Sequence, residues 1–70
     1  MRRGDKVRLS NGFFLEIDPV MPGTFYYYKP GVLMNRISWN TIKNLAENMR
    51  AEVTEAAMKL EMGFELNHHS

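Results

Sequence analysis

Apolar and polar residues alternate on both sides of an Asn-Gly pair over residues 5–18, a pattern that predicts a β-hairpin. A two-residue turn at Asn11-Gly12 would mix charged and apolar side chains on both faces of this hairpin. A three-residue turn over 10–12, closed by a glycine in the left-handed region, separates them instead. Because a shift of one residue moves every side chain to the other face, this separation favours the three-residue turn.

In this register Leu9 pairs with Phe13, and Val7 pairs with Leu15. We expect the apolar face of the hairpin to turn toward the core, with Val7, Leu9, Phe13, Leu15 and Ile17. We expect the opposite face to turn toward solvent, with Lys6, Arg8, Phe14, Glu16 and Asp18.

Two more strands are predicted after the hairpin. Residues 18–23 contain two prolines and a glycine, which favour a loop, and 24–29 form an aromatic run with high β-propensity. A type I or type II turn is predicted over 29–32, because proline stands at its second position. The chain then returns over 32–37 as a short fourth strand.

Aromatic rings occupy every position from 25 to 28, so alternation alone does not identify the inner face of this strand. We place Phe25 and Tyr27 toward the core, because phenylalanine has no polar group that needs a partner. Tyr26 and Tyr28 then stand on the outer face of the sheet.

From Ser38 onward the apolar period changes from two to 3.6, which predicts a helix with Ser38 as its N-cap. We expect one continuous helix from about Trp39 to about Met62, ended by Gly63 in a left-handed cap. Trp39 would cover one end of the core. The apolar stripe of this helix consists of Ile42, Leu45, Ala46, Met49, Val53, Ala56, Ala57 and Leu60. Such a helix spans roughly 33 Å and a six-residue strand only about 20 Å, so its last turns would extend beyond the sheet.

These elements predict one α+β domain over residues 1–70, in which an antiparallel sheet of three or four strands packs on one long C-terminal helix. The β-hairpin and the aromatic strand make the sheet region, 1–37, which the helix, 38–63, and a tail, 64–70, follow. The opening stretch 4–9, GDKVRL, resembles the first strand of small SH3-like barrels. That resemblance covers only this strand and implies no function.

The composition excludes several classes of protein and site. The chain has 70 residues, no cysteine and a net charge of +1, so disulfides and thiolate metal sites are excluded, whereas an anionic partner is neither required nor excluded. No apolar run approaches the roughly 18 residues that cross a bilayer, and no signal-peptide apolar segment follows the basic N-terminus. We therefore expect a cytoplasmic protein with no membrane partner.

No pattern typical of catalysis or cofactor binding is present in the sequence. No serine lies near a histidine in a recognisable arrangement, and there is no glycine-rich phosphate loop. His68 and His69 are adjacent, but a metal site needs three or four fixed ligands. We expect no enzymatic activity, no metal, no cofactor and no small-molecule substrate.

A second apolar strip is predicted on the helix face opposite the stripe. Ala51, Met58 and Met62 are spaced i, i+7 and i+11, and Phe64 and Leu66 follow. Methionine is common on interaction surfaces because its flexible side chain adapts to irregular partners. The strip is either a contact surface or an ordinary case of apolar exposure. As a contact surface it would form a two-fold dimer or bind a groove on another protein.

The outer face of the predicted sheet combines basic and aromatic side chains. Its candidate nucleic-acid-binding residues are Lys6, Arg8, Phe14, Tyr26, Tyr28, Lys29 and Arg36. Such a surface can stack unpaired bases and hold their phosphates. Alternatively, the tyrosines pack across strands and expose only their hydroxyls. The acidic Glu16 and Asp18 on the same face weaken the nucleic-acid hypothesis.

The two unusual surfaces, with no catalytic pattern beside them, favour a non-catalytic interaction protein. We expect it to act as a homodimer that binds a protein partner and masks or bridges it. Small regulators and inhibitors, including those of phages and other mobile elements, are often of this size. The alternative function is single-stranded nucleic-acid binding through the outer face of the sheet.

Overall fold

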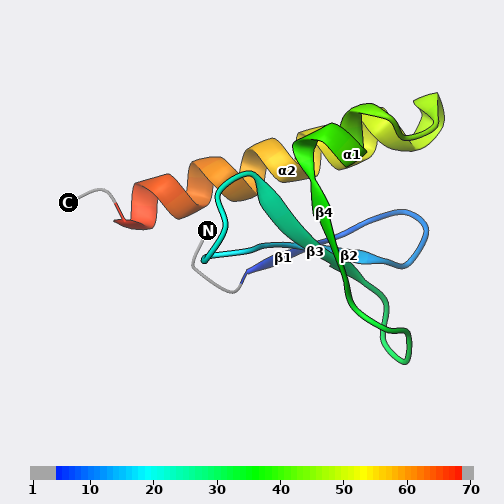
Figure 1. The fold of residues 1–70 in the computed structure, drawn as a ribbon, viewed down its shortest axis with the longest axis horizontal. Helices are drawn as coiled ribbons and strands as arrows, with labels where there is room; N and C mark the ends of the chain where they lie inside the picture. Colours follow the sequence, from blue (N-terminus) through cyan, green and yellow to red (C-terminus); the bar gives the residue numbers. More distant parts are fainter. Residues whose placement is uncertain (1–4, 69–70) are drawn as a thin grey trace.

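The computed structural model describes the backbone of residues 5–68 and the side chains of residues 5–63. Four strands precede two helices along the chain (Figure 1). The strands are β1 (Lys6–Arg8), β2 (Phe14–Ile17), β3 (Thr24–Tyr28) and β4 (Asn35–Ser38), and the helices are α1 (Trp39–Lys43) and α2 (Glu47–His68).

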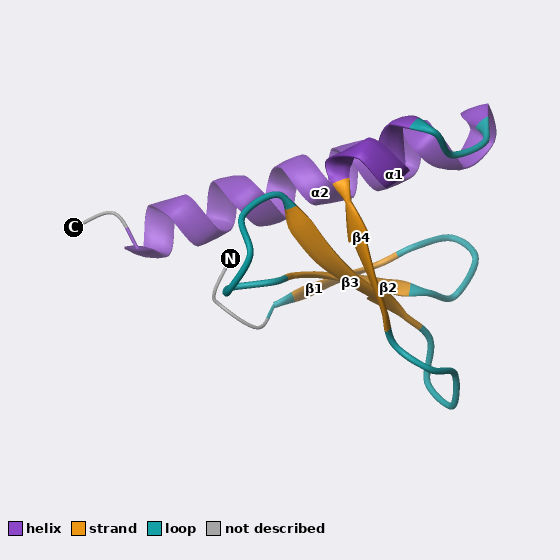
Figure 2. Ribbon diagram, viewed as in Figure 1, coloured by secondary structure: helices purple, strands orange, loops and turns teal. Residues whose placement is uncertain are grey.

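The strands form one open antiparallel sheet in the order β1-β2-β3-β4. Figure 2 shows both helices on the same side of this sheet, so one face is covered and the other carries no helix. The predicted α+β class is confirmed. Within residues 5–68, neither helix combines the length and the apolarity that a bilayer crossing requires.

The N-terminal hairpin has the predicted three-residue turn. The N–H of Leu9 donates to the carbonyl of Phe13 at 2.7 Å, and the N–H of Gly12 donates to the carbonyl of Leu9 at 3.0 Å. Gly12 has a φ of 88°, in the left-handed region that a glycine enters without a steric cost. Val7 lies opposite Leu15, so the predicted register is also confirmed.

This hairpin turn is attached to α2 through Ser10. The backbone N–H and the hydroxyl of Ser10 donate to the two carboxylate oxygens of Glu52, each over 2.8 Å. Hydrogen bonds to an ionised carboxylate are stronger than those between neutral groups. They therefore hold the turn against the helix.

The core lies between the inner face of the sheet and the two helices. Leu15 and Phe25 from the sheet and Ile42 and Val53 from the helices are almost completely buried. The other buried apolar residues are Leu9, Ala56, Ala57 and Leu60, and the partly buried ones packed against them are Val7, Phe13, Ile17, Tyr27, Ile37, Trp39, Leu45 and Met49. The predicted inner face of the hairpin is therefore correct.

The aromatic strand β3 turns the two expected rings inward. Phe25 is completely buried, and its ring makes an edge contact with Trp39, with centroids 5.6 Å apart. Tyr27 stacks on Phe13 at 4.6 Å, and its hydroxyl accepts a hydrogen bond from the side-chain amide of Asn11. The hydroxyl of Tyr27, the polar group of these two rings, thus has a partner.

The fourth strand begins later than predicted. The N–H of Val32 donates to the carbonyl of Lys29 at 2.9 Å, and Gly31 has a φ of 83°, so the turn is type II. The ladder with β3 begins only where Asn35 lies opposite Tyr27. Val32, Leu33 and Met34 are therefore part of the connecting loop, where the sequence predicted a strand.

The predicted single helix is wrong, because the chain reverses direction between α1 and α2 (Figure 1). The N–H groups of Asn44 and Leu45 donate to carbonyls three residues earlier, as at the end of a helix. The side-chain amide of Asn44 donates to the carbonyl of Asn40 at 2.9 Å, which competes with continuation of the helix. Ser38 is the N-cap of α1, as predicted, and accepts from the N–H of Thr41.

The predicted cap at Gly63 is also wrong. Helix α2 continues through Gly63 to His68, into the range 64–70 that the sequence assigned to a tail. A glycine inside a helix costs about 1 kcal/mol relative to alanine, which weakens the helix without ending it. In Figure 1 the C-terminal turns of α2 extend beyond the sheet, as the length of the predicted helix required.

Candidate functional surfaces

The apolar strip lies on the outer side of α2. Met58 and Met62 are 56% and 63% exposed, and Ala51 is also exposed. The three residues stay aligned despite the reversal of the chain, because all of them follow it within one helix. Together they line a shallow groove with Glu47, Arg50, Thr54, Glu55 and Lys59. Phe64 and Leu66 belong to the backbone of α2, but their side chains lie outside the described residues.

Charged side chains border the strip on both sides. Lys59 and Glu55 form an ion pair of 3.3 Å in which both side chains are mostly exposed. Exposed pairs of this kind contribute only a few tenths of a kcal/mol, so the pair does little to hold the helix. The border therefore leaves charges available near an apolar surface that no other part of residues 5–63 covers.

The outer face of the sheet brings together six of the seven residues predicted to bind nucleic acid. Cross-strand pairing places Arg8, Phe14 and Tyr28 in one row. A second row contains Lys6, Glu16, Tyr26 and Arg36. Arg36 thus joins this face, whereas the ammonium group of Lys29 lies 5.9 Å from the ring of Phe13 on the inner face.

Many groups on this outer face are already engaged within the sheet. The hydroxyl of Tyr28 donates to Glu16 at 3.0 Å, and the ammonium group of Lys6 lies 4.8 Å from the ring centre of Phe14. Burial, and then the hydrogen bond to Glu16, raise the pKa of Tyr28 above 10.0. The rings of Phe14 and Tyr28 also contact each other, with centroids 5.8 Å apart. These contacts match the cross-strand packing that the sequence left as the alternative.

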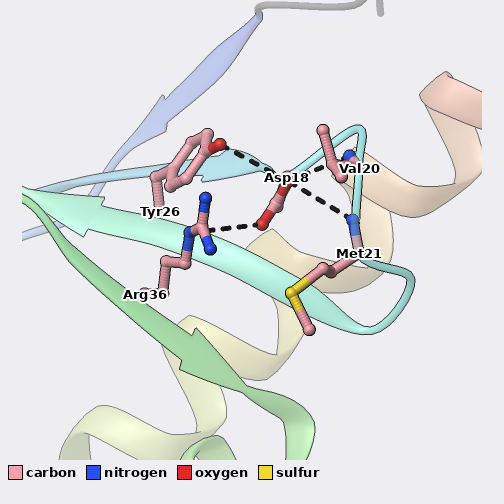
Figure 3. Close-up of polar contacts among 5 residues, drawn as sticks. All are labelled: Asp18, Val20, Met21, Tyr26 and Arg36. Atoms are coloured by element: carbon pink, nitrogen blue, oxygen red, sulfur yellow. Dashed lines mark hydrogen bonds and ion pairs between the residues drawn. The ribbon is translucent and has the colours of Figure 1, made fainter.

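Asp18 lies beneath this face in a network that the sequence did not predict (Figure 3). It is 3% exposed, although its position in the hairpin predicted a solvent-facing side chain. Its Oδ1 accepts from the N–H of Val20 at 2.9 Å, from the N–H of Met21 at 3.4 Å and from the hydroxyl of Tyr26 at 3.4 Å. Its Oδ2 lies 3.6 Å from Nε of Arg36.

The network favours the ionised form of Asp18. The hydrogen bond from Val20 is the main cause that lowers the pKa of Asp18 below 3.8, against the opposing effect of burial. The hydrogen bond from Met21, the charge of Arg36 and the hydroxyl of Tyr26 act in the same direction as Val20. Tyr26 and Arg36 therefore hold a buried carboxylate together, and the guanidinium also lies 5.7 Å from the Tyr26 ring.

One depression at the end of the sheet brings Arg8 and Phe14 of the outer face together with Lys29, whose ammonium group lies toward the ring of Phe13. It is lined by Arg8, Gly12, Phe14, Lys29 and Pro30. Within residues 5–63, neither Arg8 nor Lys29 forms an ion pair with a carboxylate. Of the predicted nucleic-acid-binding residues, Arg8, Phe14 and Lys29 thus remain grouped around an open site.

A third surface was missed by the sequence analysis. Val32, Leu33 and Met34, which we call the apolar tip, are 50%, 84% and 50% exposed in the loop between β3 and β4. The sequence signal for this surface is the apolar run 32–34, directly after Pro30-Gly31. The sequence correctly predicted a turn at Pro30-Gly31 but placed the start of the fourth strand too early, so it assigned this run to the strand. The loop projects from the sheet on the side away from the helices (Figure 1).

The described residues do not gather three or more His, Asp or Glu side chains around a position suited to a metal ion. His68 is described only by its backbone, and His69 lies outside the described residues. Comparison of the chain with models of protein families, with curated proteins and with solved structures gave no match.

Proposed function

We propose that the protein is a non-catalytic interaction protein that associates through the strip Ala51, Met58 and Met62 on α2. A second copy of the chain is the first partner, and the resulting homodimer binds a protein and masks or bridges it. This is the mode of action of a small cytoplasmic regulator or inhibitor. The proposal rests on one observation, the alignment of two largely exposed methionines on a helix whose opposite side is buried.

The size of the domain supports self-association. A domain of about this length buries only about 60% of the surface that its unfolded chain exposes, so its stability is small. There is no cysteine in the sequence to add a disulfide. Pairing of two exposed strips would remove apolar surface from water at about 25 cal/mol per Å². Symmetric dimers are the commonest oligomers, and methionine packs well against an irregular opposing surface.

The test is the mass of the protein in solution, measured by size exclusion with light scattering. We expect a dimer for the unchanged chain and a monomer for Met58→Glu combined with Met62→Glu, because paired strips would bury the new charges. Val32→Glu combined with Leu33→Glu is the matched control, because it adds the same charge to another exposed apolar surface. A monomeric unchanged chain, or a strip variant that stays dimeric, would contradict the proposal.

A second candidate function is single-stranded nucleic-acid binding by the outer face of the sheet. The supporting observation is the depression in which Arg8 and Lys29 lie beside Phe14. Such a site would stack a base and bind its phosphate. The engagement of Tyr26 and Arg36 with Asp18 counts against a wider binding surface.

The second function is tested by the fluorescence anisotropy of a labelled single strand. We expect binding at low salt that weakens as salt is raised, because phosphate contacts release counterions. Arg8→Ala should weaken binding, and Lys43→Ala in α1, on the opposite side of the sheet, should leave it unchanged. If the labelled strand fails to bind at low salt, this candidate is removed.

A further inference from the structure

The apolar tip is unusual because three consecutive large apolar residues, Val32, Leu33 and Met34, are all at least half exposed. Single exposed apolar side chains are ordinary on protein surfaces, whereas a continuous exposed run is uncommon without a function. Leu33 is 84% exposed, more than any other large apolar residue described. The tip therefore leaves a compact apolar surface in water.

The fold presents this tip as a projection between two paired strands. Its base is closed by the type II turn at Pro30-Gly31, in which proline fixes one dihedral and Gly31 adopts a φ of 83°. The strands β3 and β4 on either side belong to the ladder of the sheet. Figure 1 shows the loop extending away from α2, so the tip can reach a flat surface without interference from the helices.

The charges around the tip are basic. Residues 29–35, which form the loop and its two ends, contain no aspartate or glutamate and contain Lys29. Lys29 stands at the base of the tip and shares a depression with Arg8 of β1, which is two strands away from β3 in the sheet. At the same end of the sheet, Glu52 is held by two hydrogen bonds from Ser10. An apolar projection with basic residues at its base complements an apolar phase bordered by anionic groups.

We propose that the apolar tip docks on an anionic lipid bilayer, with Val32, Leu33 and Met34 entering the boundary of the acyl chains. Lys29 and Arg8 then lie at the level of the headgroups and contact their phosphates and carboxylates. Peripheral binding of this kind combines buried apolar area with attraction to anionic lipids.

Docking on a bilayer surface differs from the expected absence of a membrane partner, which rested on the absence of a spanning segment. It is also independent of the proposed dimer, because the tip and the strip on α2 share no residue. Two signals, an apolar insertion and a basic border, are the usual requirement for stable attachment to a bilayer surface. The tip supplies the first signal and the depression at its base supplies the second.

The test is co-sedimentation of the full chain with vesicles of phosphatidylcholine alone and of phosphatidylcholine mixed with phosphatidylserine. We expect binding to the mixed vesicles that weakens with salt, and much weaker binding to the neutral vesicles. Leu33→Glu should reduce binding to the mixed vesicles by about tenfold or more, because it removes the apolar insertion and adds a repelled charge. Lys29→Ala should reduce the preference for the anionic vesicles.

The matched control is Val20→Glu, since Val20 is 75% exposed in the loop between β2 and β3 at the opposite end of the sheet. It adds the same charge as Leu33→Glu and should bind vesicles like the unchanged chain, and circular dichroism should show both variants folded. Absence of binding to either vesicle at low salt would overturn the proposal. So would equal losses in the two variants, or binding of a labelled single strand with the same dependence on Leu33.

Discussion

The indole N–H of Trp39 donates a hydrogen bond to the carboxylate of Glu61 over 3.0 Å. In one continuous helix these two residues would lie about 33 Å apart along the axis. The contact forms only because the chain reverses between α1 and α2 and brings the first residue of α1 beside the later turns of α2. It also accounts for a glutamate in the second half of a helix, where the dipole alone does not favour one.

Replacement of Glu61 by alanine should lower the free energy of unfolding by about 1 kcal/mol, because a partly buried indole N–H loses a charged acceptor. Urea denaturation measures the change. Glu55→Ala is the control, since Glu55 lies on the same helix and forms only an exposed ion pair with Lys59. The free energy of unfolding of Glu55→Ala should stay within about 0.5 kcal/mol of that of the unchanged chain. Equal losses in the two variants would show that the contact with Trp39 adds nothing.

Gly12→Ala should destabilise the fold by about 1–2 kcal/mol, because a Cβ is unfavourable in the left-handed region that this residue occupies. A Cβ at Gly12 would meet only Cε of Lys29 at 3.7 Å, so the effect comes from the backbone and not from a clash. Gly12→Asn should cost less than Gly12→Ala, because asparagine tolerates this conformation. Thermal or urea unfolding of both variants tests that order, and a reversed order would contradict the backbone explanation.

The protein should lose stability in acid, because protonation of Asp18 weakens the contacts that its carboxylate makes in the fold. Because the pKa of Asp18 is lowered in the fold, its stabilising effect is present above the usual value of 3.8 and is lost as the pH falls through the lowered pKa. Asp18→Asn should therefore lower stability at neutral pH and reduce the further loss below about pH 4. Urea midpoints measured across this range test the prediction, with Glu55→Gln as an exposed control. An unchanged acid profile in Asp18→Asn would contradict it.

The hairpin shows how much the sequence can predict when the determining contacts are local. Only the three-residue turn separates the apolar from the charged residues, and Gly12 supplies the one conformation that this turn needs. The inward placement of Phe25 followed from chemistry that belongs to the side chain itself. The strip on α2 was located for a similar reason, since Ala51, Met58 and Met62 are related by the period of one helix.

The reversal after α1 was not predicted because the apolar period continues through it. Ile42, Leu45 and Met49 keep the spacing of one helical face across Asn44, and both arrangements direct them to the core. The capping contact of Asn44 with Asn40 is a local signal, but it is weak beside that period. Packing of two helices against the sheet decided the outcome, and the period alone does not contain that information.

The sequence by itself determined the class of the fold, the hairpin register and the faces of the strands and of α2. These follow from periods of two and 3.6 and from the conformational freedom of one glycine. Only the tertiary structure decided the reversal between the helices, the burial of Asp18 and the exposure of the apolar tip. Each of these depends on residues far apart in the chain, such as Trp39 with Glu61 and Asp18 with Arg36, whose proximity exists only after the sheet and helices have packed.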